Sequence, residues 1–298
     1  MFEQINVTPQ GEKVAEKIPR EIRKLVADLD VITRGEKRQV GHNEIVSVLI
    51  GAKPASVIGN FYYPFIDSIK HQLPDEFYID AKTQMFFNLK AIRARIAAEP
   101  QLAAAAGIDP AKPIRSQLRE IQSRATDDPS EQLYVGFVLG YPERAVRNYA
   151  RSQELRQKGA VLADHFFIGG LDLLVDKLNI HDWDQSDFDK LLEMKTNYEK
   201  RKAQLQAEKV DDAVGKSLNE MREQYKTEIK AFYQKYQGLD SSDADFLLSQ
   251  RQVQIRNNND EEVYLFVDFG SEQEIKNDPS YQRVKKQVDT RYSELDKK

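Results

Sequence analysis

The chain has 298 residues, of which 40% are hydrophobic and 31% are charged, so it can bury one large core or two smaller ones. Its net charge of −4 excludes a general electrostatic attraction to nucleic acid or to an anionic membrane, and any such partner needs a local basic patch. The absence of cysteine excludes disulfides, thiol catalysis and cysteine-based metal sites.

Composition also suggests a fold class and a location. With 14 glycines and 11 prolines in a highly charged chain, we expect a mainly α fold: a multi-helix bundle with a long charged helix or helical hairpin and a small C-terminal β-hairpin. The first residues lack the pattern of a secretory signal, and no window approaches the roughly 20 apolar residues of a membrane span. We expect a cytoplasmic protein with no membrane partner.

The first predicted element is an amphipathic helix over residues 19–30, where Ile22 and Leu29 belong to an apolar series at helical spacing. The polar, glycine-containing stretch that follows, 33–40, is predicted to be a loop. This loop carries three basic residues, Arg34, Lys37 and Arg38.

Two stretches, 43–61 and 129–158, share one predicted arrangement: a helix ended by a glycine, a short turn, and a second helix opened by a proline. Glycine ends a helix well because it enters the left-handed region at little cost, and proline suits the first helical position. We interpret the two stretches as an internal duplication. The glycine and proline pairs that mark the turns are Gly51 with Pro54 and Gly140 with Pro142.

The first unit, 43–61, resembles a helix-turn-helix DNA-binding motif. Val46 and the small Ser47 stand where that motif has an apolar and then a small residue. The resemblance implies that the helix opening at Pro54 enters the major groove, while the preceding basic loop contacts the DNA backbone. The implied contacts are Lys53, Ser56 and Asn60 near bases or phosphates, and Arg34, Lys37 and Arg38 on the backbone.

The turn of the second unit, Leu-Gly-Tyr-Pro at 139–142, resembles a motif of an uncharacterised prokaryotic family in which a cysteine pair follows. Arg144 and Ala145 stand where the cysteines would be, so a thiol or metal role is excluded here. The resemblance implies no known activity.

Three arginines follow this turn along one face of the predicted helix: Arg144, Arg147 and Arg151. A helix N-terminus beside arginines can bind a phosphate or a carboxylate, because its free N–H groups and its dipole favour negative charge. The alternative is a solvated face, or salt bridges to the acidic long helix.

Between these units, residues 77–79 have a strand-like composition, and 82–98 is predicted to be a helix. The stretch 99–113 mixes alanines with helix breakers, so we expect an internal joint there. Farther on, the charged segment that starts at the predicted N-cap Ser186 and runs to about residue 237 is either one long helix or a helical hairpin bending near Asp211.

The C-terminal part changes pattern again. Apolar residues alternate over 252–256 and 263–269, with turn residues between them, so a β-hairpin is predicted. Because two strands alone are marginally stable, this ribbon must pack on helices or gain a third strand, for which 77–79 is one candidate. A helix from Pro279, with Tyr281, Val284, Val288, Tyr292 and Leu295 on one side, is expected to end the chain.

We therefore divide the chain into a helical core at 1–183, a charged segment at 184–240 and a C-terminal part at 241–298. The four histidines form no i, i+4 pair, and we expect neither a metal nor a cofactor. The leading hypothesis is a non-catalytic intracellular protein that binds a protein partner through its long charged helix and its arginine-bearing surface. The alternatives are a DNA-binding regulator using 43–61 and an anion- or phosphometabolite-binding protein using the three arginines. The oligomeric state stays open.

Overall fold

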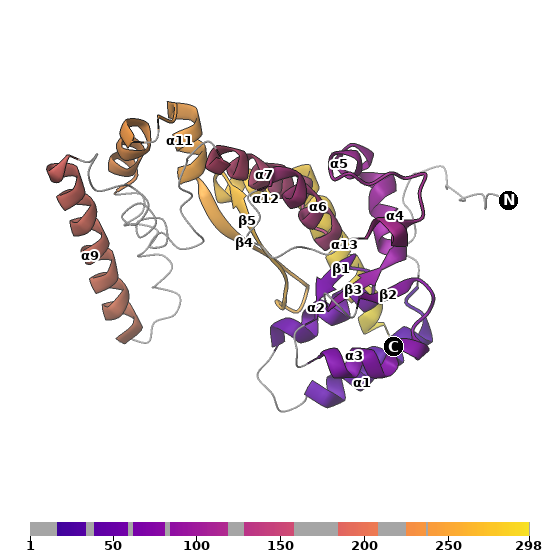
Figure 1. Cartoon of the computed structure of the whole chain (residues 1–298). Coiled ribbons are helices and arrows are strands. Elements are labelled where there is room, and N and C mark those ends of the chain that lie inside the picture. Colours follow the sequence, from indigo (N-terminus) through magenta and orange to yellow (C-terminus); the bar gives the residue numbers. More distant parts are fainter. Residues whose placement is uncertain are drawn as a thin grey trace.

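The computed structural model describes residues 17–33, 39–58, 62–80, 84–118, 128–157, 184–207, 225–236 and 238–297. The fold is mainly helical, as expected, with small antiparallel sheets (Figure 1). The helices are α1 (Arg20–Thr33), α2 (Gln39–Leu49), α3 (Tyr63–Ile69), η1 (Lys70–Gln72), α4 (Leu89–Ala98), α5 (Pro100–Ala105), η2 (Ile114–Gln117), α6 (Pro129–Leu139), α7 (Glu143–Gln157), α9 (Gln185–Ala207), α11 (Ser241–Leu248), α12 (Glu272–Asn277) and α13 (Pro279–Asp296), with a further helical segment at 225–236. The strands are β1 (Ala55–Val57), β2 (Phe77–Asp80), β3 (Met85–Asn88), β4 (Gln250–Arg256) and β5 (Glu262–Phe269).

Strands β1, β3 and β2 form an antiparallel sheet, in that order, within the N-terminal part. Phe86 in the central strand pairs with Ser56 on one side and with Ile79 on the other. The expected helix over 82–98 is therefore wrong in its first part: all four residues of β3 are buried, and α4 starts only after Asn88. The Asn88 side chain caps α4 by accepting a hydrogen bond from the Ala91 N–H at 2.9 Å.

In the described part of the first unit, 43–58, no second helix follows α2. Gly51 ends α2 with a φ of +74°, as expected, but the chain then enters strand β1. The carbonyl of Pro54 accepts a hydrogen bond from the Asn88 N–H at 2.8 Å, so pairing with β3 begins at the residue predicted to open a helix. Val57, the last residue of this strand, is 43% exposed. The helix-turn-helix geometry expected for 43–61 is therefore wrong, because a strand stands where the second helix was expected.

The second unit is confirmed as two helices joined by a tight turn. The Asp128 side chain accepts a hydrogen bond from the Ser130 N–H at 2.9 Å and so caps α6, with proline in the first turn. Gly140 ends α6 in the left-handed region with a φ of +86°. Helix α7 follows directly, and its Val146 is buried in the core.

The two glycine-containing turns meet in space. A Cβ atom on Gly140 would lie 2.4 Å from Cδ of Pro54 and 2.7 Å from the hydroxyl oxygen of Tyr264. The same hydroxyl donates a hydrogen bond to the carbonyl of Ala52 at 3.2 Å. The α2–β1 turn, the α6–α7 turn and strand β5 are therefore packed together at one point.

The C-terminal ribbon is confirmed as a β-hairpin, with Val253 opposite Phe266. It packs on helices: α2 and α7 lie against β5, and α13 lies against β4. The third strand suggested from 77–79 is wrong as a partner for this ribbon, because β2 pairs with β3 instead. Helix α13 buries the predicted apolar side, and the ribbon shares a core with α1 and α2.

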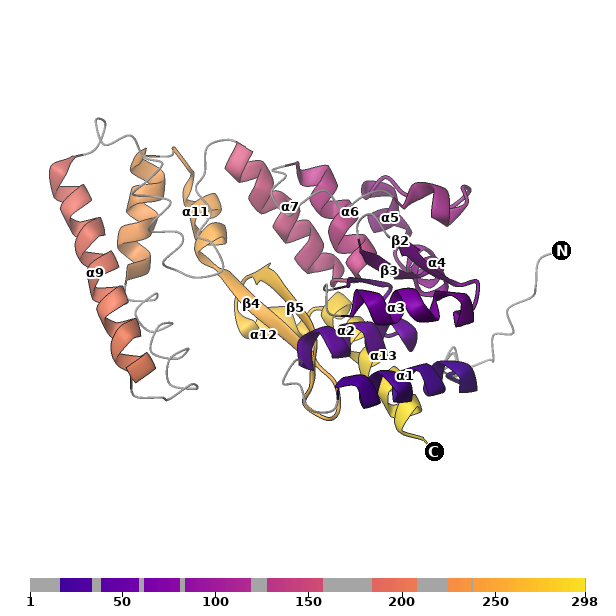
Figure 2. The same ribbon diagram turned by 60° about the horizontal axis from the view of Figure 1, so that its bottom comes forward.

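The charged segment folds back on itself. The Lys235 ammonium lies 2.6 Å from a carboxylate oxygen of Asp187, and the Tyr236 hydroxyl donates to the same oxygen at 2.8 Å. One continuous helix would place these residues roughly 70 Å apart. The hairpin alternative is therefore correct, and Figure 2 shows α9 beside the helical segment 225–236. The expected bend at Asp211 lies outside the described residues.

The base of this hairpin joins the main body through a small hydrophobic cluster. Asp184, rather than the predicted Ser186, caps α9, because its carboxylate accepts a hydrogen bond from the Ser186 N–H at 2.9 Å. The cluster combines the hairpin with α7, α11 and β5. Its buried members include Leu155, Leu191, Met194, Phe232, Tyr233, Leu247 and Phe269.

Substituting Gly140 tests the contact between the turns. Gly140→Ala is expected to lower the unfolding free energy by about 2–5 kcal/mol, since it combines an unfavourable φ with overlap of the Pro54 ring. Gly107→Ala is the matched control: its φ is +73°, but nothing lies within 4 Å of the added Cβ, so about 1–2 kcal/mol is expected. Urea denaturation measures both, and equal losses would contradict the packing argument.

Candidate functional site

Two of the residues expected to contact DNA are buried. Lys53 is 2% exposed, and its ammonium lies 3.2 Å from Glu44 and 4.9 Å from the ring centroid of Tyr264. Ser56, also buried, donates a hydrogen bond to the Glu44 carboxylate at 2.6 Å. Both side chains belong to a polar cluster between α2, β1 and β5, so their assignment as DNA contacts is wrong. The other expected contacts, Arg34, Lys37, Arg38 and Asn60, lie outside the described residues.

The three arginines of α7 do not converge on one site. Arg147 pairs with Glu143 one turn earlier, at 2.8 Å. Arg151 pairs with Asp243 of α11 at 2.9 Å, and its guanidinium lies 4.3 Å from the ring centroid of Phe246. Each of these charges is already matched by a carboxylate, which supports the salt-bridge alternative, although neither partner lies on the long helix.

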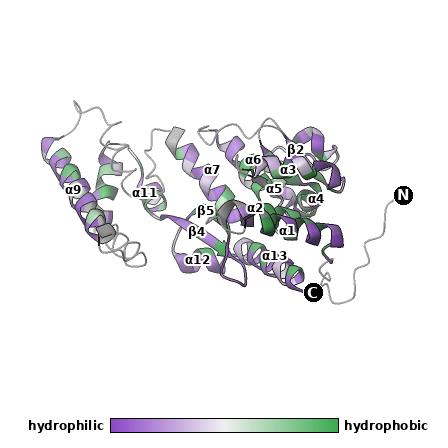
Figure 3. Ribbon diagram, turned by 90° about the horizontal axis from the view of Figure 1, so that it is seen from below, coloured by the Kyte–Doolittle hydropathy of each residue, from purple (hydrophilic) through white to green (hydrophobic). Residues whose placement is uncertain are grey.

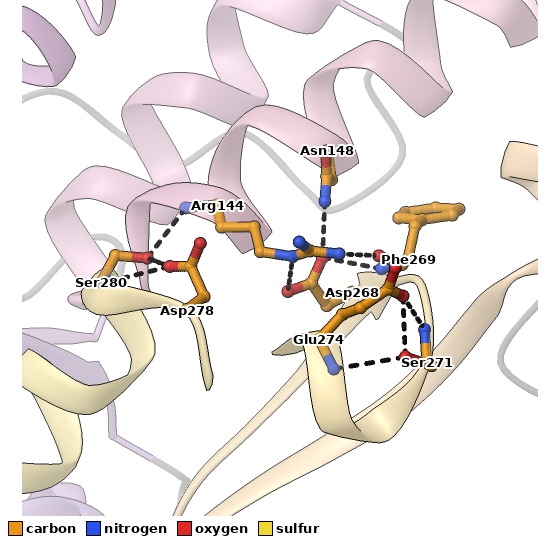
Figure 4. Close-up of polar contacts among 8 residues, drawn as sticks. All are labelled: Arg144, Asn148, Asp268, Phe269, Ser271, Glu274, Asp278 and Ser280. Carbon is orange, nitrogen blue, oxygen red and sulfur yellow. Dashed lines mark hydrogen bonds and ion pairs between the residues drawn. The ribbon is translucent and has the colours of Figure 1, made fainter. Parts of the chain in front are cut away.

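Arg144 fastens α7 to the end of β5 (Figure 4). Its guanidinium donates to the carbonyl of Phe269 at 2.5 Å and lies 3.4 Å from the carboxylate of Asp268. The buried Asp268 also accepts hydrogen bonds from the Asn148 amide at 2.8 Å and from the Phe269 N–H at 2.7 Å. Burial raises the pKa of Asp268 above its ordinary value, because desolvation disfavours the charged form. This network holds elements together and does not leave Arg144 free for a ligand.

A second buried ion network holds α4 in place. Arg95 pairs with Glu99 at 2.8 Å, and Arg283 of α13 reaches the same carboxylate. Arg95 also donates a hydrogen bond to the carbonyl of Tyr141 and covers the ring of Phe137. The inner side of α4 is thus tied to the α6–α7 turn and to α13, and the position of its outer side is fixed as a consequence.

The outer side of α4 lines a pocket of about 820 Å³, which is completed by α5, η2 and the chain between them. This volume lies in the range of small-molecule sites. Most of the lining is apolar, and the charged lining residues are basic with one exception. The apolar lining includes Leu89, Ile96, Ala97, Ala103 and Ile114, and the charged lining is Arg93, Lys112, Arg115 and Asp75.

The basic groups differ in how they are held. The Arg115 guanidinium donates to the carbonyl of Asp75 at 2.9 Å and lies 5.6 Å from the ring centroid of Tyr78, so its position is fixed. Lys112, 67% exposed, lies 3.6 Å from Asp109, a separation that gives a weak pair. Arg93 is exposed and has no hydrogen-bond or ion-pair partner among the described residues. The pocket therefore presents an excess of positive charge beside an apolar wall.

Sequence reasoning missed this pocket. The alanines and prolines of 99–113 predict a joint, whereas the folded chain uses this stretch as one wall of the pocket. The only usable signal was Arg93, which interrupts an apolar series at helical spacing between Leu89 and Ile96. The remaining charged residues come from distant parts of the chain, so periodicity could not connect them.

Across the ranges that the structure describes, no cluster of three or more potential metal-ligating residues occurs. No helix in those same ranges is both long enough and apolar enough to span a membrane. Comparisons of the chain with family models, with curated proteins and with solved structures gave no match. The candidate site therefore has to be judged on its own geometry.

The raised pKa of Asp268 predicts a pH-dependent stability. The folded protein binds the proton of the Asp268 carboxyl group more tightly than the unfolded chain does. The contribution of Asp268 to the unfolding free energy is therefore greatest at low pH, and it is lost as pH rises through the folded pKa. The unfolding free energy of the wild type minus that of Asp268→Asn should therefore fall as pH rises from about 3.5 to 7. Denaturation of both proteins across this range measures it.

Glu274→Gln gives a control of opposite sign. Hydrogen bonds from the backbone N–H and the side chain of Ser271 lower the pKa of Glu274, so its contribution is present at neutral pH and lost on acidification. The unfolding free energy of the wild type minus that of Glu274→Gln should therefore rise with pH. A rise for Asp268 as well would mean that the Arg144 ion pair outweighs desolvation.

Proposed function

We propose that the protein binds a small anionic ligand in the pocket between α4, α5 and η2. The observation that supports this most directly is the combination of a pocket of about 820 Å³ with three basic side chains and an apolar wall. The class of function is one of those expected from the sequence, but we propose this pocket as the site in place of Arg144, Arg147 and Arg151. Those three arginines are spread along α7 and matched by carboxylates.

The state of the basic groups favours binding of an anion. Arg93 can turn to a carboxylate or a phosphate without breaking an existing ion pair, and a hydrogen bond to a charged group contributes about 1.5–3 kcal/mol. Arg115 is already held by a backbone carbonyl, so little side-chain freedom is lost when it contacts a ligand. Prolines at 100, 110 and 113 restrict the backbone of the opposite wall, which reduces the ordering cost further.

A protein partner bound by the helical hairpin is the second candidate. On α9 no described side chain from Lys195 onward is buried, and Leu192 before it is 45% exposed. Figure 3 shows hydrophilic residues along the whole length of α9, with hydrophobic residues interspersed among them. Because the described side chains beyond the first turns of α9 lie at least partly at the surface, this part of the helix is accessible to a partner. DNA binding has no comparable support, because Lys53 and Ser56 are buried.

Small anions and one substitution test the pocket. Inorganic phosphate, citrate and octanoate, each titrated in a thermal shift assay, should include at least one that raises the melting temperature with concentration. Arg93→Gln should weaken that binding roughly tenfold or more, since one charge-assisted hydrogen bond is lost. Arg147→Gln removes an equal charge from α7 and should leave binding unchanged. Loss of binding in Arg147→Gln with normal binding in Arg93→Gln would place the site on α7.

Crosslinking in cells tests the second candidate. A photoactivated crosslinking residue at Glu199 on α9 should capture one defined protein reproducibly, because this side chain is exposed on the part of the helix that lies beyond the base. The same residue at Lys286, an exposed position of α13, is the matched control and should not capture it. Identical products from both positions, or none from Glu199, would contradict a role for the hairpin.

A further inference from the structure

The lining of the pocket indicates which anions fit it, an inference that rests on the proposed function. Of the twelve described residues that line it, eight are leucine, isoleucine, alanine or proline, and none is aromatic. We infer that the ligand is an aliphatic chain that ends in an anionic group, such as an alkyl carboxylate or an alkyl phosphate. The anionic end belongs at Arg93 and Arg115, and the chain belongs along the apolar wall.

The apolar wall follows one side of α4. Leu89, Arg93, Ile96 and Ala97 recur at i, i+4, i+7 and i+8, so they share a single face of the helix. The stripe from Leu89 to Ile96 covers about 10 Å along the helix axis. Arg93 lies within this stripe, so its guanidinium emerges beside apolar surface on either side. An extended chain can contact this surface while its charged end stays at the guanidinium.

The same lining disfavours nucleotides. Proteins that hold a base usually stack it on an aromatic ring or on an arginine plane. The Tyr78 ring, which lies beside Arg115, already stacks on Phe87 at a centroid distance of 5.7 Å and contacts the guanidinium of Arg115. Among the described residues that line this pocket, none therefore supplies a free ring on which a base could stack.

Electrostatics supports an anionic end. The described lining has three basic residues and one acidic residue, Asp75. The backbone carbonyl of Asp75 accepts a hydrogen bond from Arg115, and its exposed carboxylate has no ion-pair partner among the described residues. The excess of positive charge favours anions over neutral or cationic amphiphiles. A ligand with two negative charges, such as an alkyl phosphate, matches this excess better than a ligand with one.

Calorimetry on the full chain tests the inference with a series of alkyl carboxylates and alkyl phosphates of four to ten carbons. Each ligand is kept below its micelle-forming concentration. The dissociation constant should fall roughly fourfold for each added methylene until the chain outgrows the wall. Adenosine monophosphate and inorganic phosphate should bind at least tenfold more weakly than the best alkyl anion. Arg93→Gln should weaken every member of the series by a similar factor.

Two neighbouring alanines on α4 give a matched pair of variants. Ala97 lines the pocket and Ala98 does not, although both are exposed helical positions. The larger side chain in Ala97→Leu should occupy part of the space along the apolar wall, so that affinity stops rising at a shorter alkyl chain. Ala98→Leu should leave the dissociation constants of the whole series unchanged. Both substitutions place a good helix former on an exposed face, so folding should be preserved.

The outcomes separate this inference from the proposed function. If no anion binds, the proposed function fails and the inference fails with it. If anions bind without any dependence on chain length, or if adenosine monophosphate binds as tightly as octanoate, the inference alone is overturned. Binding to vesicles that contain anionic lipid, with none to the monomeric alkyl anions, would also overturn it, because the ligand would then be a membrane surface.

Discussion

The structure depends on one close contact, in which the ring of Pro54 occupies space that only a glycine at position 140 leaves open. The hydroxyl of Tyr264 fills the rest of this space and donates its hydrogen bond to Ala52, so no polar group is left unpaired there. Three segments that are distant in sequence meet at this point. The contact sets the position of β1, of the α6–α7 turn and of β5 together.

The candidate site takes its position from that contact through α4. Arg95 connects the helix to the carbonyl of Tyr141, next to Gly140, and Glu99 extends the connection to Arg283 of α13. Breaking a buried pair of this kind is costly because it leaves an uncompensated charge. The inner side of α4 is therefore rigid, and the apolar wall on its outer side is already formed before a ligand arrives.

Elements specified by local chemistry could be predicted from the sequence. Asp128 and Gly140 mark the two ends of α6, and the alternation over 263–269 identifies β5, because capping and pleating depend on neighbouring residues. Strand β1 could not be predicted, since three residues form a strand only when β3 lies beside them. The pocket was missed for the same reason, because its charged residues meet only after folding.

The helical hairpin leaves the main body and returns to it at adjacent points, since Asp187 and Tyr236 are in contact. A segment inserted in this way adds no constraint on the path of the chain on either side of it. Its length can change by paired turns, one on each helix, without moving the ribbon or α11. The length of the hairpin can thus change during evolution without a change in the core.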